Sequence, residues 1–540
     1  MRTSARGFAA TVVAVMTVTT LSGVPAAHGA AGGPKRGGSI TYAIEAETTG
    51  GFCLPASQLA AGGIEVITAI YDTLVTINTK GDLVPYLAQS VTPNATFDTW
   101  TIRLRPGIKF HNGEALDANA VKLNLDTYRG ANPKIGAPLN TFVFKPITSV
   151  TVSDPLTVVV QMSSPWPAFE GYLFGTGRVG MVAPAQLADM STCATNMIGT
   201  GPFKLVEWVP NDHLTVQRNP SYWRPGLPYL DRIKFVPAQD AQSQLNGLTG
   251  GTFDVIQTRS EQNILAMRDK KSSGSITEMD TDRGSEVGYG LLNDAKPPFN
   301  DRLARLAVAY AGDANELNQI RNKGLETIAT GPFAPGTPYY LSFPEAKASG
   351  FPHHDLAKAK AYAKQWSAAH GGQQLSYEIT TATDPSLLAL TELVREFNAR
   401  AGINVSIKQV DQATLINLAL SGNFQQATWE NHPQGDPDGL YVWFHSKSPV
   451  NFSGISDPVI DSDLEQGRVT TDPAKRVQIY RDMNRRFASQ VYELWTWYQH
   501  WGVGAQTNIG GLNGVPLPDG HGQPFSLYAG VVPTVGLYKR

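Results

Sequence analysis

The sequence predicts an α/β fold made of several domain-sized units, and three observations support this. The chain has 540 residues, which is too long for one compact core and suggests roughly three or four units. With 42% hydrophobic and 17% charged residues it is a globular rather than a disordered chain. Strand-like and helix-like patterns follow one another along it, without an internal repeat, a low-complexity tract or a long linker.

The clearest succession of elements begins at residues 100–104, where apolar and polar residues alternate as in a half-buried strand. Residues 106–107 and 110–113 form turns. Asp117 then stands at the N-cap position ahead of the apolar residues in 121–125, which predicts a helix.

Further elements fit the same fold class. Ser39–Ile44 is predicted to be a strand, and residues 64–74 carry the apolar face of a helix. Residues 142–160 contain two strands around the turn pair Asp154-Pro155. Residues 175–180 fit G-x-G-x-x-G, but prolines on both sides favour a turn over a dinucleotide site.

The N-terminus has the pattern of a secretory signal spanning residues 1–30. Arg2 and Arg6 precede an apolar run over residues 8–21, and small residues suited to cleavage follow at 25–31. A retained membrane anchor is the alternative, but the run is short of the ~20 residues that span a bilayer. We therefore expect an exported protein of the periplasm or extracellular envelope space. The formal net charge of -2 gives no overall field that would recruit nucleic acid or an anionic membrane.

The two cysteines are Cys53 and Cys193. In an exported protein, two thiols favour one disulfide, with two buried free thiols as the alternative. Neither cysteine lies in the signature of a thiolate held by a histidine.

Four motifs resemble those of the family 5 solute-binding proteins, the dipeptide-, oligopeptide- and nickel-type receptors of bacterial ABC importers. They are the segment from Trp100 to Leu125, Ile198-Gly-Thr-Gly-Pro-Phe203, the R-N-P-S-Y-W of residues 218–223, and residues 298–313. The resemblance covers nearly the whole mature chain. It implies a two-lobe α/β fold of the periplasmic-binding-protein type (class II, cluster C), with an extra inserted domain and a ligand cleft between the lobes.

The resemblance also implies how the chain is divided, with two hinge crossings between the lobes. Lobe I takes residues 37–82, 199–290 and 506–540, the inserted domain takes 83–198, and lobe II takes 291–505. Residues 21–24 look like a lipobox whose cysteine is replaced by Val24, so we expect no lipid anchor.

The residues around 427–445 bear most on the ligand. Peptide-binding relatives have a Trp here, and an Asp three residues later pairs with the peptide α-ammonium group. Trp429 matches the Trp, but His432 stands three residues on, and Asp436 follows only after an insertion. A neutral histidine does not give an amine the ion pair that a carboxylate gives. A peptide stays the leading expectation, followed by a non-peptide anionic or aromatic acid and then by a metal chelate.

The resemblance places a set of residues at the ligand, and for several of them another role stays open. Arg178 and Arg283 have a solvated surface arginine as the alternative. The aromatic residues at 495–501 have a plain core role as the alternative, and strand alternation would put Trp495 and Trp497 on one side and Tyr498 on the other. The expected ligand-binding residues are Glu45, Phe52, Arg178, Arg283, Tyr289, Trp429, Glu430, Asn431, His432, Asp436, Trp497 and Tyr498.

Catalytic motifs are missing from the sequence, which contains no P-loop, H-E-x-x-H, C-x-x-C or nucleophile elbow. Residues 436–439 lack the spaced oxygen ligands of a calcium loop, and His353-His354 precedes a predicted helix. We therefore expect a receptor that is not an enzyme and has no cofactor or bound metal. Its partners would be the small-molecule or peptide ligand and the ABC permease subunits, with the receptor as a monomer. A secreted hydrolase is the remote alternative.

Overall fold

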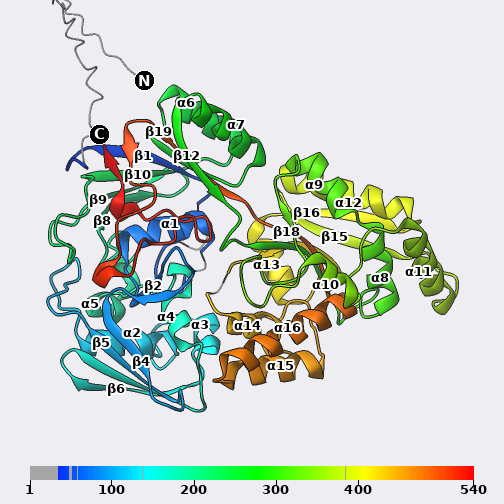
Figure 1. Ribbon diagram of the computed structural model, residues 1–540, viewed down its shortest axis with the longest axis horizontal. Coiled ribbons are helices and arrows are strands. Elements are labelled where there is room, and N and C mark those ends of the chain that lie inside the picture. The colour runs from blue at the N-terminus through cyan, green and yellow to red at the C-terminus, as the bar shows by residue number, and fades with distance from the viewer. Residues whose placement is uncertain (1–33, 48–50, 58, 137, 384, 434) are drawn as a thin grey trace, which may run out of the picture. The chain divides into compact units, whose positions relative to one another are not determined.

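The computed structural model describes residues 34–540, apart from 48–50, 58, 137, 384 and 434. The predicted signal segment, residues 1–30, and the predicted lipobox at 21–24 lie outside the described residues. The described chain is organised around a seven-stranded, a six-stranded and a four-stranded sheet, together with two short two-stranded ones (Figure 1).

The seven-stranded sheet, with its helices, is called lobe I below. Its order is β12-β19-β11-β1-β10-β9-β8, and β1 runs parallel to both of its neighbours, β10 and β11. Both faces of β1 are covered: Tyr42 packs in the cluster that includes α1, and Ala43 packs in the cluster of α6 and α7. The elements are β1 (Ser39–Ile44), α1 (Ala61–Ile70), β8 (Phe203–Val209), β9 (His213–Arg218), β10 (Arg232–Pro237), α6 (Ala241–Gly250), β11 (Val255–Thr258), α7 (Glu261–Ser272), β12 (Ile276–Thr281) and β19 (Trp501–Gln506).

The four-stranded sheet has the order β4-β5-β7-β6. In β5, Trp100, Ile102 and Leu104 are buried as the alternation predicts, and Asp117 caps α2 by accepting a hydrogen bond from the Ala120 amide at 2.9 Å. Its elements are β4 (Ala88–Pro93), β5 (Thr99–Leu104), α2 (Ala118–Tyr128), α3 (Pro138–Val143), β6 (Ile147–Asp154), β7 (Thr157–Met162), α4 (Phe169–Phe174) and α5 (Pro184–Ala188).

The six-stranded sheet, with its helices, is called lobe II. Its order is β14-β18-β13-β17-β15-β16. One face carries the core of α14, α15 and α16, and the other face carries α8, α11 and α12. Its elements are β13 (Val287–Leu292), α8 (Arg302–Ala311), α9 (Ala314–Asn322), β14 (Thr327–Ile328), α10 (Phe343–Ala348), α11 (Leu356–Ala369), β15 (Ser376–Ala382), α12 (Pro385–Arg400), β16 (Asn404–Val410), α13 (Gln412–Leu420), β17 (Gln426–Asn431), α14 (Leu440–Phe444), α15 (Pro458–Val469), α16 (Pro473–Gln490) and β18 (Glu493–Tyr498).

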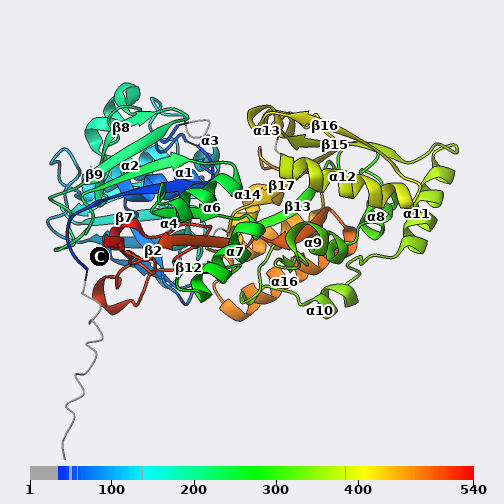
Figure 2. The same cartoon turned by 90° about the horizontal axis from the view of Figure 1, so that it is seen from above.

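The C-terminal segment returns to lobe I, and Figures 1 and 2 both show its red end beside the blue N-terminal strand. The Lys539 ammonium lies 3.1 Å from the Asp254 carboxylate at the start of β11. The remaining short strands are β2 (Val75–Ile77), which pairs with β3 (Leu83–Pro85), and β20 (Ile509–Gly510), which pairs with β21 (Tyr538–Lys539).

Two segments connect the lobes, one from β12 to β13 and one from β18 to β19. They touch where the Gln499 amide donates to the Glu286 carbonyl at 2.8 Å. The domain division of the sequence stays a prediction. Because β13 belongs to the lobe II sheet and β19 to the lobe I sheet, we propose that the crossings lie at residues 282–286 and 499–500.

Two predicted details of local structure are wrong. The helix predicted for residues 64–74 is α1, which ends at Ile70, because Tyr71 adopts an extended conformation and the chain enters β2. The predicted alternation in β18 fails because a register irregularity against β13 interrupts it. Trp495 and Tyr498 consequently share one core cluster, and Trp497 lies in a different one.

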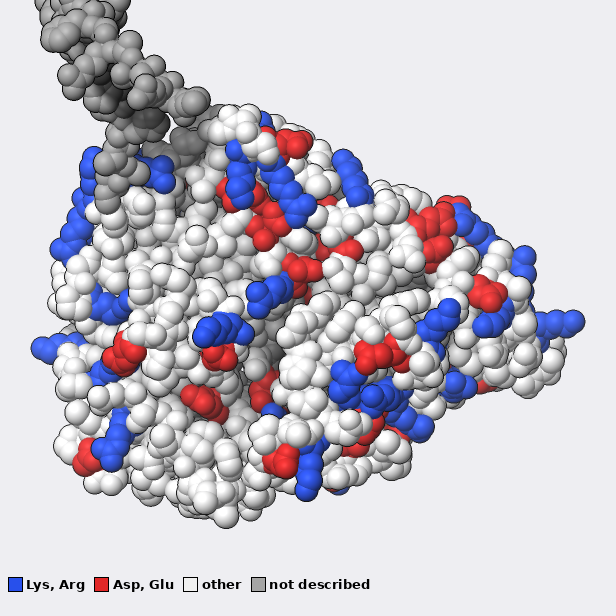
Figure 3. All heavy atoms as spheres, viewed as in Figure 1, with Lys and Arg blue, Asp and Glu red and all other residues white. Residues whose placement is uncertain are grey.

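The predicted disulfide between Cys53 and Cys193 is confirmed, with Cα atoms 5.9 Å apart. The predicted turn at residues 175–180 is also confirmed, because Gly175 ends α4 in the left-handed conformation. Within the described residues, the helices are too short or too polar to cross a membrane. On the face shown in Figure 3, acidic and basic side chains are interspersed, in keeping with the small net charge.

Candidate functional site

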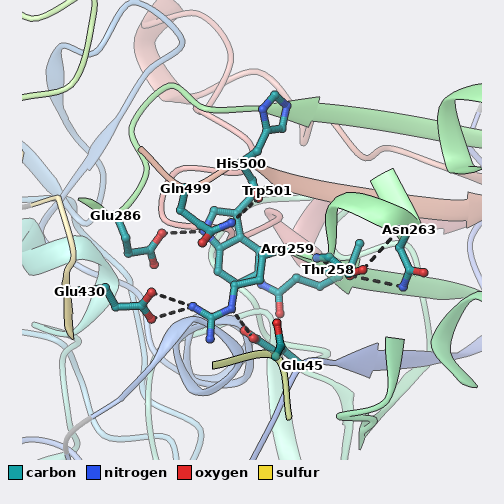
Figure 4. Close-up of polar contacts among 12 residues, drawn as sticks. Glu45, Thr258, Arg259, Asn263, Glu286, Glu430, Gln499, His500 and Trp501 are labelled. Atoms are coloured by element: carbon teal, nitrogen blue, oxygen red, sulfur yellow. Dashed lines mark hydrogen bonds and ion pairs between the residues drawn. The ribbon is translucent and has the colours of Figure 1, made fainter. Parts of the chain in front are cut away.

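A charged cluster joins the two lobes at Arg259, which directly follows β11 of lobe I. Its Nη1 donates to both carboxylate oxygens of Glu430 in β17 of lobe II, each at 2.7 Å. Its Nε donates to Glu45, which directly follows β1. Figure 4 shows the guanidinium group between the two carboxylates. We call Glu45, Arg259 and Glu430 the interlobe triad.

The triad contains two carboxyl groups and one guanidinium group. Burial raises the pKa of Glu45, the charges of Glu430 and Glu286 raise it further, and Arg259 only partly opposes this. Burial by itself would lower the pKa of Arg259, but the carboxylates of Glu430 and Glu45 raise it above its ordinary value. The guanidinium is therefore charged at all working pH values, and the acids around it compete for it.

A second polar link lies beside the triad, at Glu286 in the first lobe crossing. Its Oε1 lies 2.7 Å from Nδ1 of His432, and its Oε2 accepts a hydrogen bond from the Trp501 indole at 2.6 Å. The Glu286 side chain is only 1% exposed. Burial by itself would raise the pKa of Glu286, but the interactions with His432 and Trp501 outweigh it and hold the pKa at about 2. Glu286 is therefore an ionised, fully engaged carboxylate.

The loop after β17 also contacts the four-stranded sheet with its helices, which is called the four-stranded unit below. The Thr176 hydroxyl donates to the Pro433 carbonyl at 2.6 Å, and the Trp166 indole donates to Asp438 at 2.8 Å. Arg468 of lobe II donates to the same Asp438 carboxylate at 2.9 Å. These bonds fix the loop on both of its sides.

Asp436, expected near a ligand amine, is held inside lobe II. It accepts from Nη1 and Nη2 of Arg476 at 2.8 and 2.5 Å, and its other bond, to the Asp438 amide, caps a short turn. Arg476 lies in α16 and is buried. An ammonium group at Asp436 would have to compete with this bidentate pair.

The expected residues of the lobe II sheet lie mostly in its core. Trp429 packs edge-on against Phe452 with ring centroids 5.2 Å apart, and Tyr289 packs on Trp495 at 5.0 Å. Asn431, at the end of β17, is 5% exposed.

Two further expected residues also have structural partners. The Tyr498 hydroxyl donates to the Phe333 carbonyl at 2.7 Å, and burial raises its pKa above the ordinary value. Trp497 is 5% exposed and packs with Leu317 and Phe397 under the guanidinium of Arg321.

Three expected residues remain, and each contacts protein groups outside the interlobe triad. Arg178 is half-buried, donates to the Leu59 carbonyl at 2.7 and 3.1 Å, and has its pKa lowered to about 10 by burial, against the opposing charge of Glu286. Arg283 is exposed and lies over the Phe525 ring at 5.4 Å. Phe52 is 1% exposed and packs against Trp208.

Sequence reasoning missed Arg259 and Glu286, whereas Trp501 was one of the aromatic residues for which a core role and a site role both stayed open. A signal for Arg259 was present, because Glu45 and Arg259 each follow a buried strand, and the carboxyl ends of parallel strands meet at one edge of a sheet. Glu286 carried no comparable signal, since its bond to Trp501 depends on the crossing of two segments far apart in the chain.

Two α/β lobes, joined by two crossings and meeting over a charged cluster, define the class of two-lobe solute-binding proteins. The family model of "Bacterial extracellular solute-binding proteins, family 5 Middle" matches residues 82–452, and the chain belongs to that family. It is thus a solute-binding component of an ABC importer.

Comparisons with individual proteins agree with the assignment to this family. The chain is 27% identical over 441 residues to the glutathione-binding protein GsiB of Pectobacterium atrosepticum, covering 77% of this chain and 80% of the relative. Its fold is similar to AgaA from A. tumefaciens R10 in complex with agropinic acid, with a TM-score of 0.79 at 22% identity, over 93% of this chain and 99% of that one. It is also similar to DppA from Helicobacter pylori in complex with the peptide STSA, with a TM-score of 0.78 at 19% identity, over 94% and 98% of the two chains. These similarities confirm the predicted two-lobe periplasmic-binding-protein fold.

Proposed function

We propose that this protein captures a peptide or a similar small solute between its lobes and delivers it to the permease subunits of its importer. The observation that carries the proposal is the interlobe triad, because Arg259 and Glu45 of lobe I meet Glu430 of lobe II there. A solute with charged groups would add its own contacts to the charged residues of both lobes and so bridge the lobes itself. Its preference for the closed arrangement would then shift the open–closed equilibrium.

The named ligands of the similar proteins support a small organic solute. They are glutathione for GsiB, the peptide STSA for DppA and agropinic acid for AgaA. A non-peptide acid is the second candidate for this chain. It is favoured by His432, which stands where peptide receptors carry an acid, and by the Arg259 guanidinium.

We further propose that the capture is reversible and involves no covalent chemistry, because the similar proteins are named as binding proteins. The mature chain would work in the envelope space as an unanchored monomer. Within the described part of the chain, His, Cys, Asp and Glu form no group of three that could hold a metal ion, so a chelate would have to bring its own ligands.

Thermal unfolding of the mature protein with a panel of solutes tests this function. The panel contains amino acids, α-linked di- to tetrapeptides, glutathione and small organic acids. A bound solute should raise the melting temperature, since ligand at about 100 times its Kd adds about 2.7 kcal/mol. The solute should be recovered unchanged. Cleavage of a bound solute that is lost on substituting a single residue would instead establish a hydrolase.

A further inference from the structure

We propose that the interlobe triad recognises an α-amino acid head group, with the solute's α-carboxylate on Arg259 and its α-ammonium group on Glu45 and Glu430. The solute class is one that carries both charges on one carbon, as a γ-glutamyl peptide does and an ordinary α-linked peptide does not. This inference rests on the proposed function and specifies which chemistry its site selects.

The backbone on both sides of Arg259 is fixed. The preceding strand, β11, pairs with β1 and β19 inside the sheet. The following residue, Ser260, caps α7 by accepting from the Asn263 amide at 3.3 Å, and its own amide donates to the Thr258 hydroxyl at 3.1 Å. Arg259 is thus presented from rigid elements, which lowers the cost of ordering it around a ligand.

The guanidinium has donor capacity left for an anion. Nε is used by Glu45 and Nη1 by Glu430, and Nη2 donates no hydrogen bond within the described residues. The Arg259 side chain is 33% exposed, so a solute can reach it. A planar guanidinium edge matches a carboxylate better than any other side chain does.

The two carboxylates of the triad, Glu45 and Glu430, can accept further hydrogen bonds from a cation. Two of them share one guanidinium, and the Glu430 side chain is 38% exposed. The neighbouring Glu286 is already engaged by His432 and Trp501, and Asp436 by Arg476. Glu45 and Glu430 are therefore the acids of this region that an ammonium group can reach without breaking a link elsewhere.

A solute with both charges makes more contacts with the triad than a solute with one. A solute with only a carboxylate would approach Arg259 against the repulsion of two acids, and a solute with only an amine would leave the remaining donor of Arg259 unused. A head group that carries both charges a bond or two apart would meet an opposite charge at each end. The triad consequently selects against a solute with only a carboxylate, and it offers a zwitterion more contacts than it offers an amine alone.

Isothermal titration with a matched pair of tripeptides tests the inference. The probes are reduced glutathione, whose first residue is γ-linked and keeps its head group intact, and its α-linked isomer Glu-Cys-Gly, which has the same composition. Wild-type protein should bind the γ-linked form at least about tenfold more tightly. In Arg259→Gln this preference should fall to near unity, and Arg259→Lys should restore only part of it. Arg400→Gln, a surface variant, should keep it, and melting curves establish that each variant is folded.

A separate control tests whether the site recognises the α-ammonium group of the solute. N-acetylated glutathione should bind the wild type at least about tenfold more weakly than glutathione, and Glu430→Gln should weaken glutathione more than it weakens the acetylated form. Equal binding of the two tripeptide isomers, or a preference that survives Arg259→Gln, overturns this inference and leaves the proposed function standing. If no member of the solute panel or of this pair binds the wild type, the proposed function falls and the inference falls with it.

Discussion

At the scale of single residues, Glu286 shows how neighbours decide a charge. It is buried, which disfavours its ionised form, yet His432 and Trp501 hold its pKa at about 2. A folded-state pKa below the unfolded value stabilises the fold above the unfolded pKa. That stabilisation is lost as the pH falls from the ordinary 4.5 toward 2.

We predict that Glu286→Gln lowers the free energy of unfolding by about 3 kcal/mol at pH 7 and by clearly less near pH 3. Urea unfolding at the two pH values measures this. The surface substitution Glu396→Gln should show no such convergence. A deficit of Glu286→Gln that is the same at both pH values would mean that the carboxylate charge does not stabilise the fold.

The sequence indicated some of the residues that lie in this region, but it did not indicate which residues they contact. Glu45 and Glu430 were expected near the ligand, and they lie in the triad, but their common partner Arg259 was missed. Asp436 was chosen because of its type and spacing. Its link to Arg476, forty residues further along the chain, depends on how α16 packs and has no sequence signature.

At the scale of elements, the loop after β17 is an irregular segment held by lobe II and by the four-stranded unit. Asp436 ties it to α16, and Thr176 and Trp166 contact it from the four-stranded unit. These contacts make the loop part of the scaffold that positions Glu430 and His432.

We predict that Asp436→Asn destabilises the protein by about 3 to 5 kcal/mol, because a buried Arg476 would lose its charge partner. Urea unfolding measures this. Asp472→Ala, which removes only the cap of the same helix α16, should cost about 1 kcal/mol. If Asp436→Asn is as stable as the wild type but loses solute binding, then Asp436 binds the ligand, as the sequence predicts.

Strands and helices with strong periodicity were predictable, including β1, β5 and the capped helix α2. The end of α1 and the irregularity in β18 were not. Both depend on pairing with distant segments, since Thr73 forms a bridge to Gly180 and β18 is held by β13. Local propensity does not contain that information.

At the scale of the whole molecule, the disulfide restricts the unfolded chain. It joins residues 140 apart in sequence. Closing a loop of this length removes about 5 kcal/mol of unfolded-state entropy in the chain-entropy model. We predict that the paired substitution of Cys53 and Cys193 by serine lowers the urea midpoint strongly, and that reductant affects the wild type but not this variant. Equal midpoints for the two proteins would contradict the prediction.

The lobes are linked in this structure by the protein's own charges. We predict that Glu430→Gln, which removes an interlobe ion pair, shifts the solute-free protein toward the open form. Small-angle X-ray scattering should then give a larger radius of gyration than for the wild type or for Arg400→Gln. Identical scattering curves would mean that the triad does not contribute to closure.

We expect this protein to hold one small solute between its lobes and to release it unchanged. Native mass spectrometry of the mature protein, purified from its own cells without denaturation, tests this without a prior choice of ligand. We predict a population carrying one small molecule, which denaturation releases intact and which rebinds to the emptied protein. A covalent adduct, or conversion of the released molecule when it is returned to the protein, would contradict the claim.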